Sequence, residues 1–265
     1  MGRRIRHILM ILLGVVFLFS ICFILVVQYE YRENQRLYQN TAKQFTTAVS
    51  GEDTPVNGQG GTAIAGEPGG AKGPPITVDF QALQAVNSDI TGWLYCQGTP
   101  INYPVLQGED NDAYLRRNYA GEHVSAGSIF VESLNQRNFI DANTIIYGHH
   151  MRDGSMFACL DQWAEEGFYE EHPVMWLLTP DQDYRIDIFA GYTTSGYSDT
   201  YTIFTGSCEE LDTYLEKAVA QSDFQTEVAA DGKGRYVVLS TCAYVFTDAR
   251  YVLHGVLVPV EAEKP

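Results

Sequence analysis

An uninterrupted apolar segment near the N-terminus sets the first limit on how this chain can fold. Residues 8–27 are 20 residues without a charged side chain. As a helix, such a segment spans about 30 Å, the thickness of the hydrocarbon core of a bilayer. Three arginines lie within residues 1–7, and no acidic residue precedes the segment. Under the positive-inside rule we expect a single-pass anchor in the cell membrane, with a basic cytoplasmic tip at 1–7 and the rest of the chain outside the cell.

A cleaved signal peptide is the alternative interpretation of this segment. Signal peptides normally have a shorter apolar region that ends in a cleavage site of small residues. Here the apolar run continues to Val27, and the sequence QYEYREN that follows has no A-x-A pattern. We therefore expect an uncleaved transmembrane helix over residues 8–27.

The charge balance limits the partners of the exterior part. The chain carries 17 Lys and Arg against 33 Asp and Glu, a formal net charge of −16. A nucleic-acid-binding surface needs an excess of basic side chains to contact phosphates, so we expect no nucleic-acid partner. Apolar residues make up 45% of the chain, enough for a sizeable core, which excludes global disorder.

Composition divides the rest of the chain into three parts. Residues 28–50 are polar with a weak stripe at every fourth position, which predicts a juxtamembrane helix; the stripe consists of Leu37, Thr41, Phe45 and Val49. Residues 51–76 are rich in Gly and Pro, which predicts a flexible linker. Residues 77–262 have the composition of one globular domain.

Within the globular domain, short segments rich in β-forming residues alternate with turn signals. These segments are 92–96, 101–107, 127–133, 143–149, 174–179, 183–194, 235–241 and 249–260. Two helices are expected between them: one over 80–86 with Asp79 as its cap, and one after a capping box formed by Ser207 and Glu210. Many strands and few helices predict a mainly β fold, a closed barrel with helical insertions.

Three residues of this domain carry functional groups at the ends of predicted strands. Cys242 follows the apolar strand at 235–241, and Arg250 begins the next strand, so an antiparallel pair would bring them together. His149 follows a strand that ends at Gly148. Each also has a structural interpretation: a buried thiol, a surface arginine paired with an acid, or a surface loop histidine. Together, a thiol nucleophile, an imidazole and a guanidinium are the set that acyl transfer through a thioester requires.

The sequences around these residues resemble the sortases, membrane-anchored cysteine transpeptidases of Gram-positive bacteria. The matching motifs are LSTC at 239–242, Arg250 at the start of the following strand, and IIYGHHM at 145–151. The resemblance extends over residues 79–260 and is greatest to class B. Two positions depart from the class B pattern: Val238 replaces a Thr, and His150 replaces an Asn.

The resemblance implies a closed eight-stranded sortase-type β-barrel over residues 77–262 and a mechanism without a cofactor. Cys242 would attack the carbonyl of a Thr in a C-terminal sorting signal of a secreted protein and form a thioester. His149 would protonate the leaving amine, and Arg250 would stabilise the oxyanion. An amine of the peptidoglycan precursor or cross-bridge would then accept the protein. No Cys or His pair with zinc-like spacing accompanies His149 and His150, so we expect no metal.

Further residues are expected to line the peptide groove or to pack in the core. Ser240, two positions before the nucleophile, would face the same groove, and the resemblance places Tyr201 and the helix at 209–221 in a wall of the peptide groove. His254 and Thr241 are interpreted as core residues.

The cysteine count is odd, at five. Besides Cys242 and the anchor residue Cys22, we expect Cys96, Cys159 and Cys208 to pack in the core, and a disulfide among them is left open.

Two other functions are compatible with the residues. One is an L,D-transpeptidase-like enzyme or cysteine peptidase of the cell wall, although such transpeptidases typically place their Arg closer to the cysteine. The other is a non-enzymatic, membrane-tethered ectodomain in which Cys242 would be inert.

Overall fold

The computed structural model describes residues 2–49 and 73–261. It divides the chain into two compact units, Met1–Asn40 and Thr41–Pro265. Most of the expected linker, residues 51–72, lies outside the described residues.

The N-terminal region forms one long helix, α1 (Gly2–Phe45). It contains a stretch with a mean hydropathy of 3.2 that is long and apolar enough to cross a membrane. The helix expected over 28–50 ends earlier, because Thr46–Ala48 form strand β1, which pairs antiparallel with β2 (Ile76–Val78). The β-branched Thr46 and Thr47 favour this extended conformation, and the linker expected to reach residue 76 is shortened by β2.

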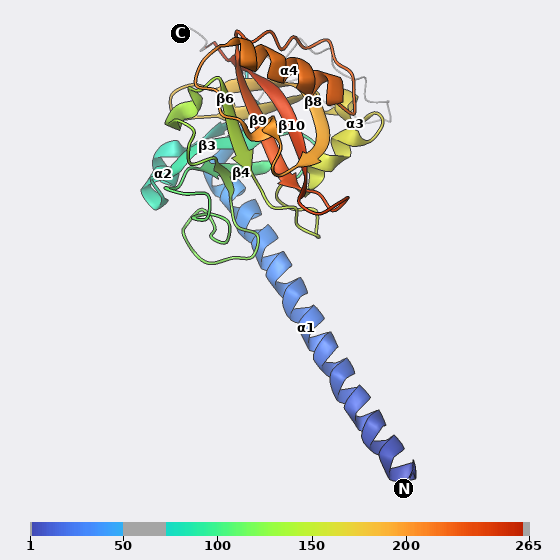
Figure 1. The fold of residues 1–265 in the computed structure, drawn as a ribbon. Coiled ribbons are helices and arrows are strands. Elements are labelled where there is room, and N and C mark those ends of the chain that lie inside the picture. The colour runs from blue at the N-terminus through green and yellow to red at the C-terminus, as the bar shows by residue number, and fades with distance from the viewer. Residues whose placement is uncertain (1, 50–72, 262–265) are drawn as a thin grey trace, which may run out of the picture. The chain divides into compact units, whose positions relative to one another are not determined.

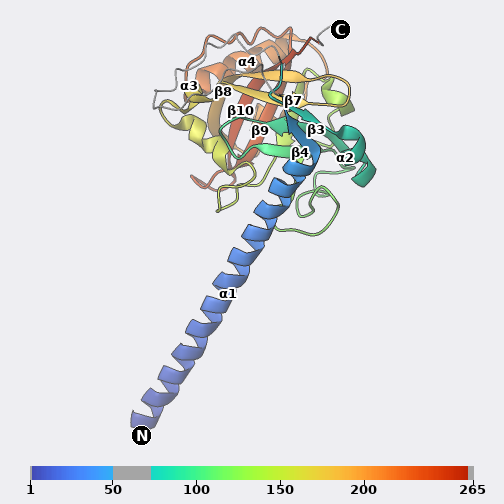
Figure 2. The ribbon, with the colours of Figure 1, turned by 180° about the vertical axis from the view of Figure 1, so that it is seen from behind.

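Eight strands close into a barrel, which confirms the expected fold (Figure 1). They are β3 (Ile90–Tyr95), β4 (Asn102–Leu106), β5 (Ile129–Val131), β6 (Asn143–Tyr147), β7 (Val174–Leu178), β8 (Tyr184–Ser195), β9 (Arg235–Cys242) and β10 (Ala249–Pro259). Their order around the barrel is β10-β8-β7-β3-β4-β5-β6-β9. All neighbours are antiparallel except β4–β5 and β6–β9, which are parallel. Figure 2 shows the barrel from behind, with β3, β4 and β7 in view.

Burial along the strands follows the sequence pattern. In β8, Tyr184, Ile186 and Ile188 are buried, whereas Arg185 and Asp187 between them form an ion pair with Nε–Oδ1 at 2.6 Å. Strand β9 is different, because six consecutive residues from 236 to 241 are buried. A strand is buried on both faces when other elements cover its outer side, and Tyr236 and Val238 of β9 belong to the buried cluster that includes side chains from residues 211–218.

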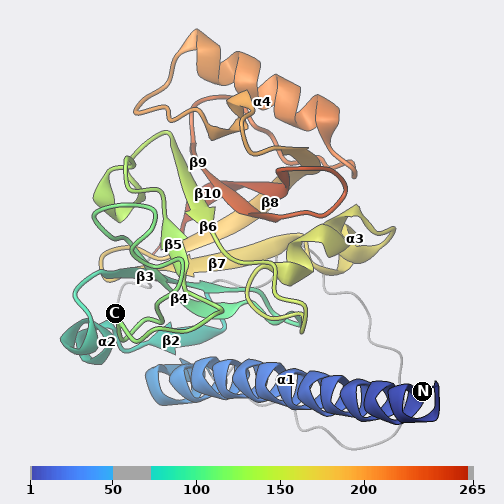
Figure 3. The same ribbon diagram turned by 60° about the horizontal axis from the view of Figure 1, so that its bottom comes forward.

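Helices cover the barrel at separate places. They are α2 (Phe80–Val86), η1 (Arg137–Phe139), η2 (Ala158–Ala164), α3 (Phe168–Glu171), η3 (Asp199–Tyr201) and α4 (Glu209–Gln221). Figure 3 shows α4 beside β8–β10, whereas α2 lies beside β3 and β4 on the far side of the barrel. Buried α4 residues pack with the barrel residues Phe189 and Val238 in one apolar cluster; these α4 residues are Leu211, Tyr214, Leu215 and Ala218.

One predicted cap is confirmed and the other is wrong. Asp79 caps α2, since its Oδ1 accepts a hydrogen bond from Ala82 N at 2.9 Å. The N-cap of α4 is Cys208 and not Ser207, and Cys208 makes no capping hydrogen bond. The Ser207 hydroxyl instead donates to the carbonyl of Gly232 at 2.7 Å, a partner 25 positions away that a local motif cannot reveal.

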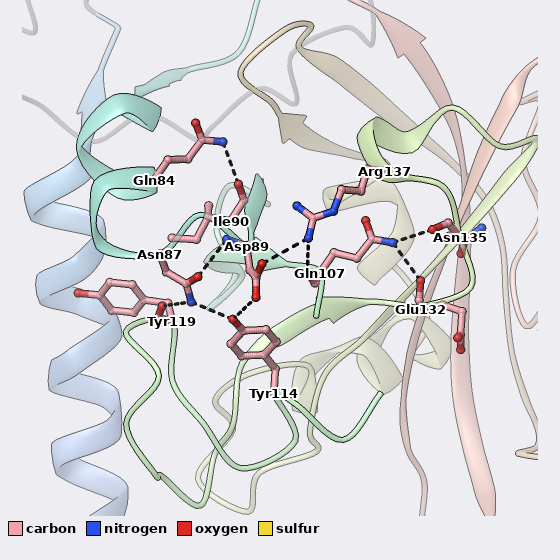
Figure 4. A network of polar contacts seen from close by, with 10 residues as sticks. All are labelled: Gln84, Asn87, Asp89, Ile90, Gln107, Tyr114, Tyr119, Glu132, Asn135 and Arg137. Carbon is pink, nitrogen blue, oxygen red and sulfur yellow. Dashed lines mark hydrogen bonds and ion pairs between the residues drawn. The ribbon is translucent and has the colours of Figure 1, made fainter. Parts of the chain in front are cut away.

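A polar network fixes the long connection between β4 and β5, residues 107–128 (Figure 4). Tyr114 donates to Asp89 Oδ2 at 2.8 Å and accepts from Asn87 Nδ2 at 2.9 Å. The same amide nitrogen of Asn87 also donates to the carbonyl of Tyr119 at 2.9 Å. These bonds tie the connection to the residues just before β3 and so determine where its side chains lie.

Candidate active site

Strand pairing brings Cys242 and Arg250 together. In the antiparallel ladder of β9 and β10, Arg250 lies directly opposite Cys242. Directly opposed residues in such a pair have Cβ atoms about 4.5–5.5 Å apart. The hairpin between them is closed by a hydrogen bond of 2.9 Å from Ala243 N to the carbonyl of Ala249. This is the arrangement predicted from the sequence.

His149 reaches the same place by a parallel pairing. Strand β6 runs beside β9 with Tyr147 opposite Ser240. Beyond the ladder, Gly148 N donates to the carbonyl of Ser240 at 3.1 Å, and the Thr241 hydroxyl donates to the carbonyl of Gly148 at 2.9 Å. Continued by two residues, the same register would bring His149 level with Cys242, and both residues line one cavity.

Gly148 is required by close packing. A Cβ atom there would lie 2.5 Å from Ile129 Cδ1 and 2.6 Å from Phe157 Cγ, too close for any side chain. The backbone therefore approaches the core closely just before His149, as the sequence suggested.

The hydrogen bonds of His149 fix its tautomer. Its Nε2 lies 2.7 Å from the carbonyl oxygen of Leu115. Because a carbonyl oxygen can only accept, Nε2 carries a proton, and in the neutral ring Nδ1 is the basic atom. The neighbouring His150 has other partners, with Nε2 at 3.1 Å from Asp161 Oδ2 and its ring edge-to-face with Tyr244. In residues 2–49 and 73–261, no three or more His, Cys, Asp or Glu side chains are grouped to hold a metal.

Arg250 is half-buried and keeps most of its donors. Its Nη1 donates to the carbonyl of Ala249 at 3.0 Å. Among the described residues, Arg250 forms no ion pair with any carboxylate, and the neighbouring Asp248 is no exception. A guanidinium has five N–H donors, so its fork is available to a negatively charged oxygen.

The three residues line one cavity of about 220 Å³. Its other lining residues are Asn111, Asp112, Leu115, Phe130, Tyr147, Gly148, Ser240 and Thr241. A larger cavity of about 900 Å³ lies between α3, β8 and residues 219–228. No cysteine or histidine lines that cavity, so the chemistry favours the smaller one.

The two expected substrate-binding residues lie one behind the other. Ser240 lines the cavity, is only 2% exposed, and is 2.8 Å from the hydroxyl of Tyr201. Tyr201 does not line the cavity and stacks on Tyr147, with ring centroids 6.3 Å apart. Thr241, expected in the core, is buried but also lines the cavity, whereas no residue of α4 does.

Comparisons with known proteins assign this barrel to a family. No protein-family model matches the chain. Sortase B of Listeria monocytogenes is 37% identical over 257 residues, which are 96% of this chain and 96% of that protein. This chain belongs to the sortase B family. As a sortase it is a cysteine transpeptidase, which favours the interpretation from the motifs over an L,D-transpeptidase-like enzyme and a non-enzymatic ectodomain.

Solved structures of sortase B share its fold. The Staphylococcus aureus sortase B–substrate complex aligns with a TM-score of 0.65 at 32% identity, covering 69% of this chain and 85% of that one. Sortase B from B. anthracis aligns with a TM-score of 0.63 at 39% identity, covering 68% and 84%. The two departures from the class B motifs, Val238 and His150, do not line the cavity of this sortase.

Sequence reasoning missed several residues of the sortase cavity. Tyr147 lies two positions before His149, and period two would have placed both on one face of the strand. Phe130 comes from β5, within a segment already recognised as strand. Asn111, Asp112 and Leu115 had no sequence signal, because they reach the cavity only through the folded β4–β5 connection.

All five cysteines of this sortase are free. Burial raises the pKa of Cys96 and of Cys159 to about 12, so both remain protonated thiols. Cys208 is exposed, which corrects the expectation that it packs in the core. Among the described residues, Cys242 is the one cysteine that lines either of the two cavities, which makes it the candidate nucleophile.

Proposed function

We propose that this sortase cleaves a C-terminal sorting signal of secreted proteins at a Thr carbonyl and transfers the protein to an amine of the cell wall. The observation that carries the proposal is the convergence of Cys242, His149 and Arg250 on one cavity. The solved complex of Staphylococcus aureus sortase B with a substrate supports substrate binding by a barrel of this fold.

The chemistry proceeds in two steps. The Cys242 thiolate attacks the Thr carbonyl carbon, and the C–N bond breaks as His149, protonated on Nδ1, gives its proton to the leaving amine. The product is a thioester between Cys242 and the Thr carbonyl. An incoming amine then attacks the thioester, gives a proton to His149, and releases the thiolate as the new amide forms. A covalent intermediate thus replaces one difficult step by two easier ones.

Arg250 acts on the charge that develops in both steps. The carbonyl oxygen becomes negative in each tetrahedral intermediate, and the free N–H groups of the guanidinium stabilise it. A preorganised donor of this kind contributes about 10²–10³ in rate.

A membrane anchor would keep the enzyme close to both of its substrates. The apolar stretch of α1 supports a single-pass anchor, and the three arginines in residues 1–7 support a cytoplasmic N-terminus. The barrel is then extracellular, where it meets both secreted proteins and the peptidoglycan precursor or cross-bridge amine.

The test uses the full-length chain in detergent micelles, an amine, and two kinds of substrate: sorting-signal peptides of the LPxTG, NPxTN and SPxTG types, and peptidoglycan stem peptides for comparison. We expect a transfer product and a Cys242 acyl adduct by mass spectrometry with at least one peptide. Cys242→Ala abolishes the adduct, and His149→Ala and Arg250→Ala each lower kcat by about 10²–10³. Full activity in the Cys242→Ala protein, or cleavage only of peptidoglycan stem peptides, contradicts the proposal.

A further inference from the structure

We propose that Glu132 sets the hydrogen-bond polarity of one wall of the cavity, so that Asn111 offers a donor and Tyr147 an acceptor to one peptide unit of the substrate. The inference rests on the proposed function, since it assumes a peptide in this cavity. It makes Glu132 a positioning residue, because the cavity is lined by Asn111 and Tyr147 and not by Glu132 itself.

Four donors surround the carboxylate of Glu132, which is 7% exposed. Asn111 Nδ2 and the Tyr147 hydroxyl donate to Oε2 at 2.7 and 3.0 Å. The Ser133 hydroxyl and Leu134 N donate to Oε1 at 3.2 and 3.1 Å. Both oxygens therefore act only as acceptors, as an ionised carboxylate does.

The backbone of Glu132 is held as firmly as its side chain. Its N–H donates to the carbonyl of Ile145 at 2.9 Å. Its carbonyl accepts from Gln107 Nε2 at 3.3 Å, and the same Gln107 nitrogen donates to the carbonyl of Asn135 at 2.7 Å (Figure 4). The carboxylate is thus a fixed reference from which its partners take their orientation.

Tyr147 is left with an acceptor. Its hydroxyl hydrogen points to Glu132, so only oxygen lone pairs are available elsewhere. Burial and the neighbouring Glu132 carboxylate both raise the pKa of Tyr147, so the hydroxyl keeps this hydrogen.

Asn111 is left with a donor. Its Oδ1 accepts from Ser133 N at 2.9 Å while its Nδ2 donates to Glu132. If the amide were flipped, its NH₂ group would face the Ser133 N–H donor and its oxygen would face the Glu132 oxygen acceptor. Neither contact is a hydrogen bond, so the orientation is fixed. Among the described residues these bonds use one amide hydrogen, and the second is free for a ligand.

A peptide unit complements this pair, since its carbonyl accepts and its N–H donates. A glutamine at position 132 would present an NH₂ group to one of the two donors, and Tyr147 could then turn its hydrogen toward the cavity. If the Glu132 carboxylate had a purely structural role, its replacement would change stability alone. If it sets the polarity of the wall, its replacement also changes which ligand groups the cavity binds.

The first test is Glu132→Gln in the full-length chain. We expect KM for the peptide to rise about tenfold and kcat to change by less than about threefold, as for one lost hydrogen bond to the ground state. Alkylation of Cys242 by iodoacetamide should keep its wild-type rate. Glu132→Asp, which retains the charge, should recover part of the affinity. Equal KM values in wild type and Glu132→Gln overturn the inference, as does a loss confined to kcat.

The second test reads the polarity with ester substitutions. Peptides in which one amide after another is replaced by an ester lack one N–H donor each. In wild type, one replacement should raise KM about tenfold, and in Tyr147→Phe the same replacement should cost nothing further. Equal sensitivity in both proteins overturns the inference.

Binding to the Cys242→Ala chain, measured by calorimetry with the same peptides, separates the two proposals. Binding that depends on Glu132 without any transfer by wild type contradicts the proposed function alone. If wild type transfers the peptide and peptide affinity is the same with and without Glu132→Gln, only the polarity inference is contradicted. No binding and no transfer with any peptide contradicts both.

Discussion

Close packing and a hydrogen bond of individual residues hold the candidate active site in place. Gly148 carries the backbone past Ile129 and Phe157 immediately before His149. The carbonyl of Leu115 then orients the His149 ring at 2.7 Å. The position of the His149 imidazole thus depends on the absence of a Cβ at residue 148 and on the hydrogen bond to the Leu115 carbonyl.

Gly148→Ala should therefore impair both stability and activity. The added Cβ would overpack the core at a cost of about 1–3 kcal/mol, and it would displace His149, for which a shift of about 1 Å costs on the order of 10² in rate. Urea unfolding and the rate of acyl-adduct formation measure the two effects. Gly206→Ala is the matched control, because a Cβ at Gly206 meets nothing within 4 Å; comparable losses in both variants would refute the packing argument.

His254 makes the stability of the barrel depend on pH. It is 1% exposed beside Tyr192 and Tyr214, and burial lowers the pKa of His254 to about 3. The unfolded chain protonates this ring near pH 6.5 and the folded chain does not, so stability falls as the pH drops from about 6.5 to 3.

We expect this histidine to account for about 2 kcal/mol of lost stability between pH 7 and pH 5. His254→Phe should lose that part of the pH dependence, since it keeps the aromatic packing and removes the titrating group. Urea unfolding of both proteins at the two pH values measures the difference. Parallel pH profiles would mean that folding does not shift the pKa of this ring.

At the scale of elements, α4 lacks one stabilising feature. Cys208 occupies the N-cap with an extended backbone and makes no capping hydrogen bond. The first turn already carries Glu209, Glu210 and Asp212, which interact favourably with the positive end of the helix dipole.

Cys208→Ser should stabilise the protein by about 0.5–2 kcal/mol, because a serine hydroxyl can accept a hydrogen bond from an N–H group of the first turn. Ser207→Ala is the informative companion, since it removes the bond to Gly232 and not a cap. Thermal unfolding measures both. A destabilised Cys208→Ser protein would show that the thiol contributes packing that its exposure does not suggest.

At the scale of the whole molecule, the barrel unit begins before the linker. Phe45, 5% exposed, packs edge-to-face on Tyr119 at 6.4 Å, and β1 pairs with β2. The barrel unit therefore includes a piece of chain that composition assigned to a juxtamembrane helix.

A chain truncated to residues 41–265 should retain the stability of the full-length barrel and leave the membrane fraction. One truncated to 77–265 loses β1 and Phe45, and burial of that ring alone contributes about 1.5–3 kcal/mol. Thermal unfolding of the two truncated proteins measures the difference. Identical melting temperatures would show that β1 and Phe45 add nothing to the barrel.

The sequence by itself determined the features that depend on local pattern. The apolar segment predicted the helix, alternation and turn signals predicted the strands and the barrel, and the hairpin spacing predicted that Cys242 meets Arg250. These follow from neighbours in the chain, where hydrophobic periodicity and turn chemistry act directly.

Only the tertiary structure decided what surrounds the three candidate residues. Leu115 and Asn111 reach the cavity because Tyr114 ties their loop to Asp89, a hydrogen bond across 25 positions. Ser207 fails as a cap for the same kind of reason, since a distant carbonyl takes its hydroxyl. The hydrogen-bond partner of a polar side chain depends on which groups folding brings within about 3 Å, and a local sequence pattern does not contain that information.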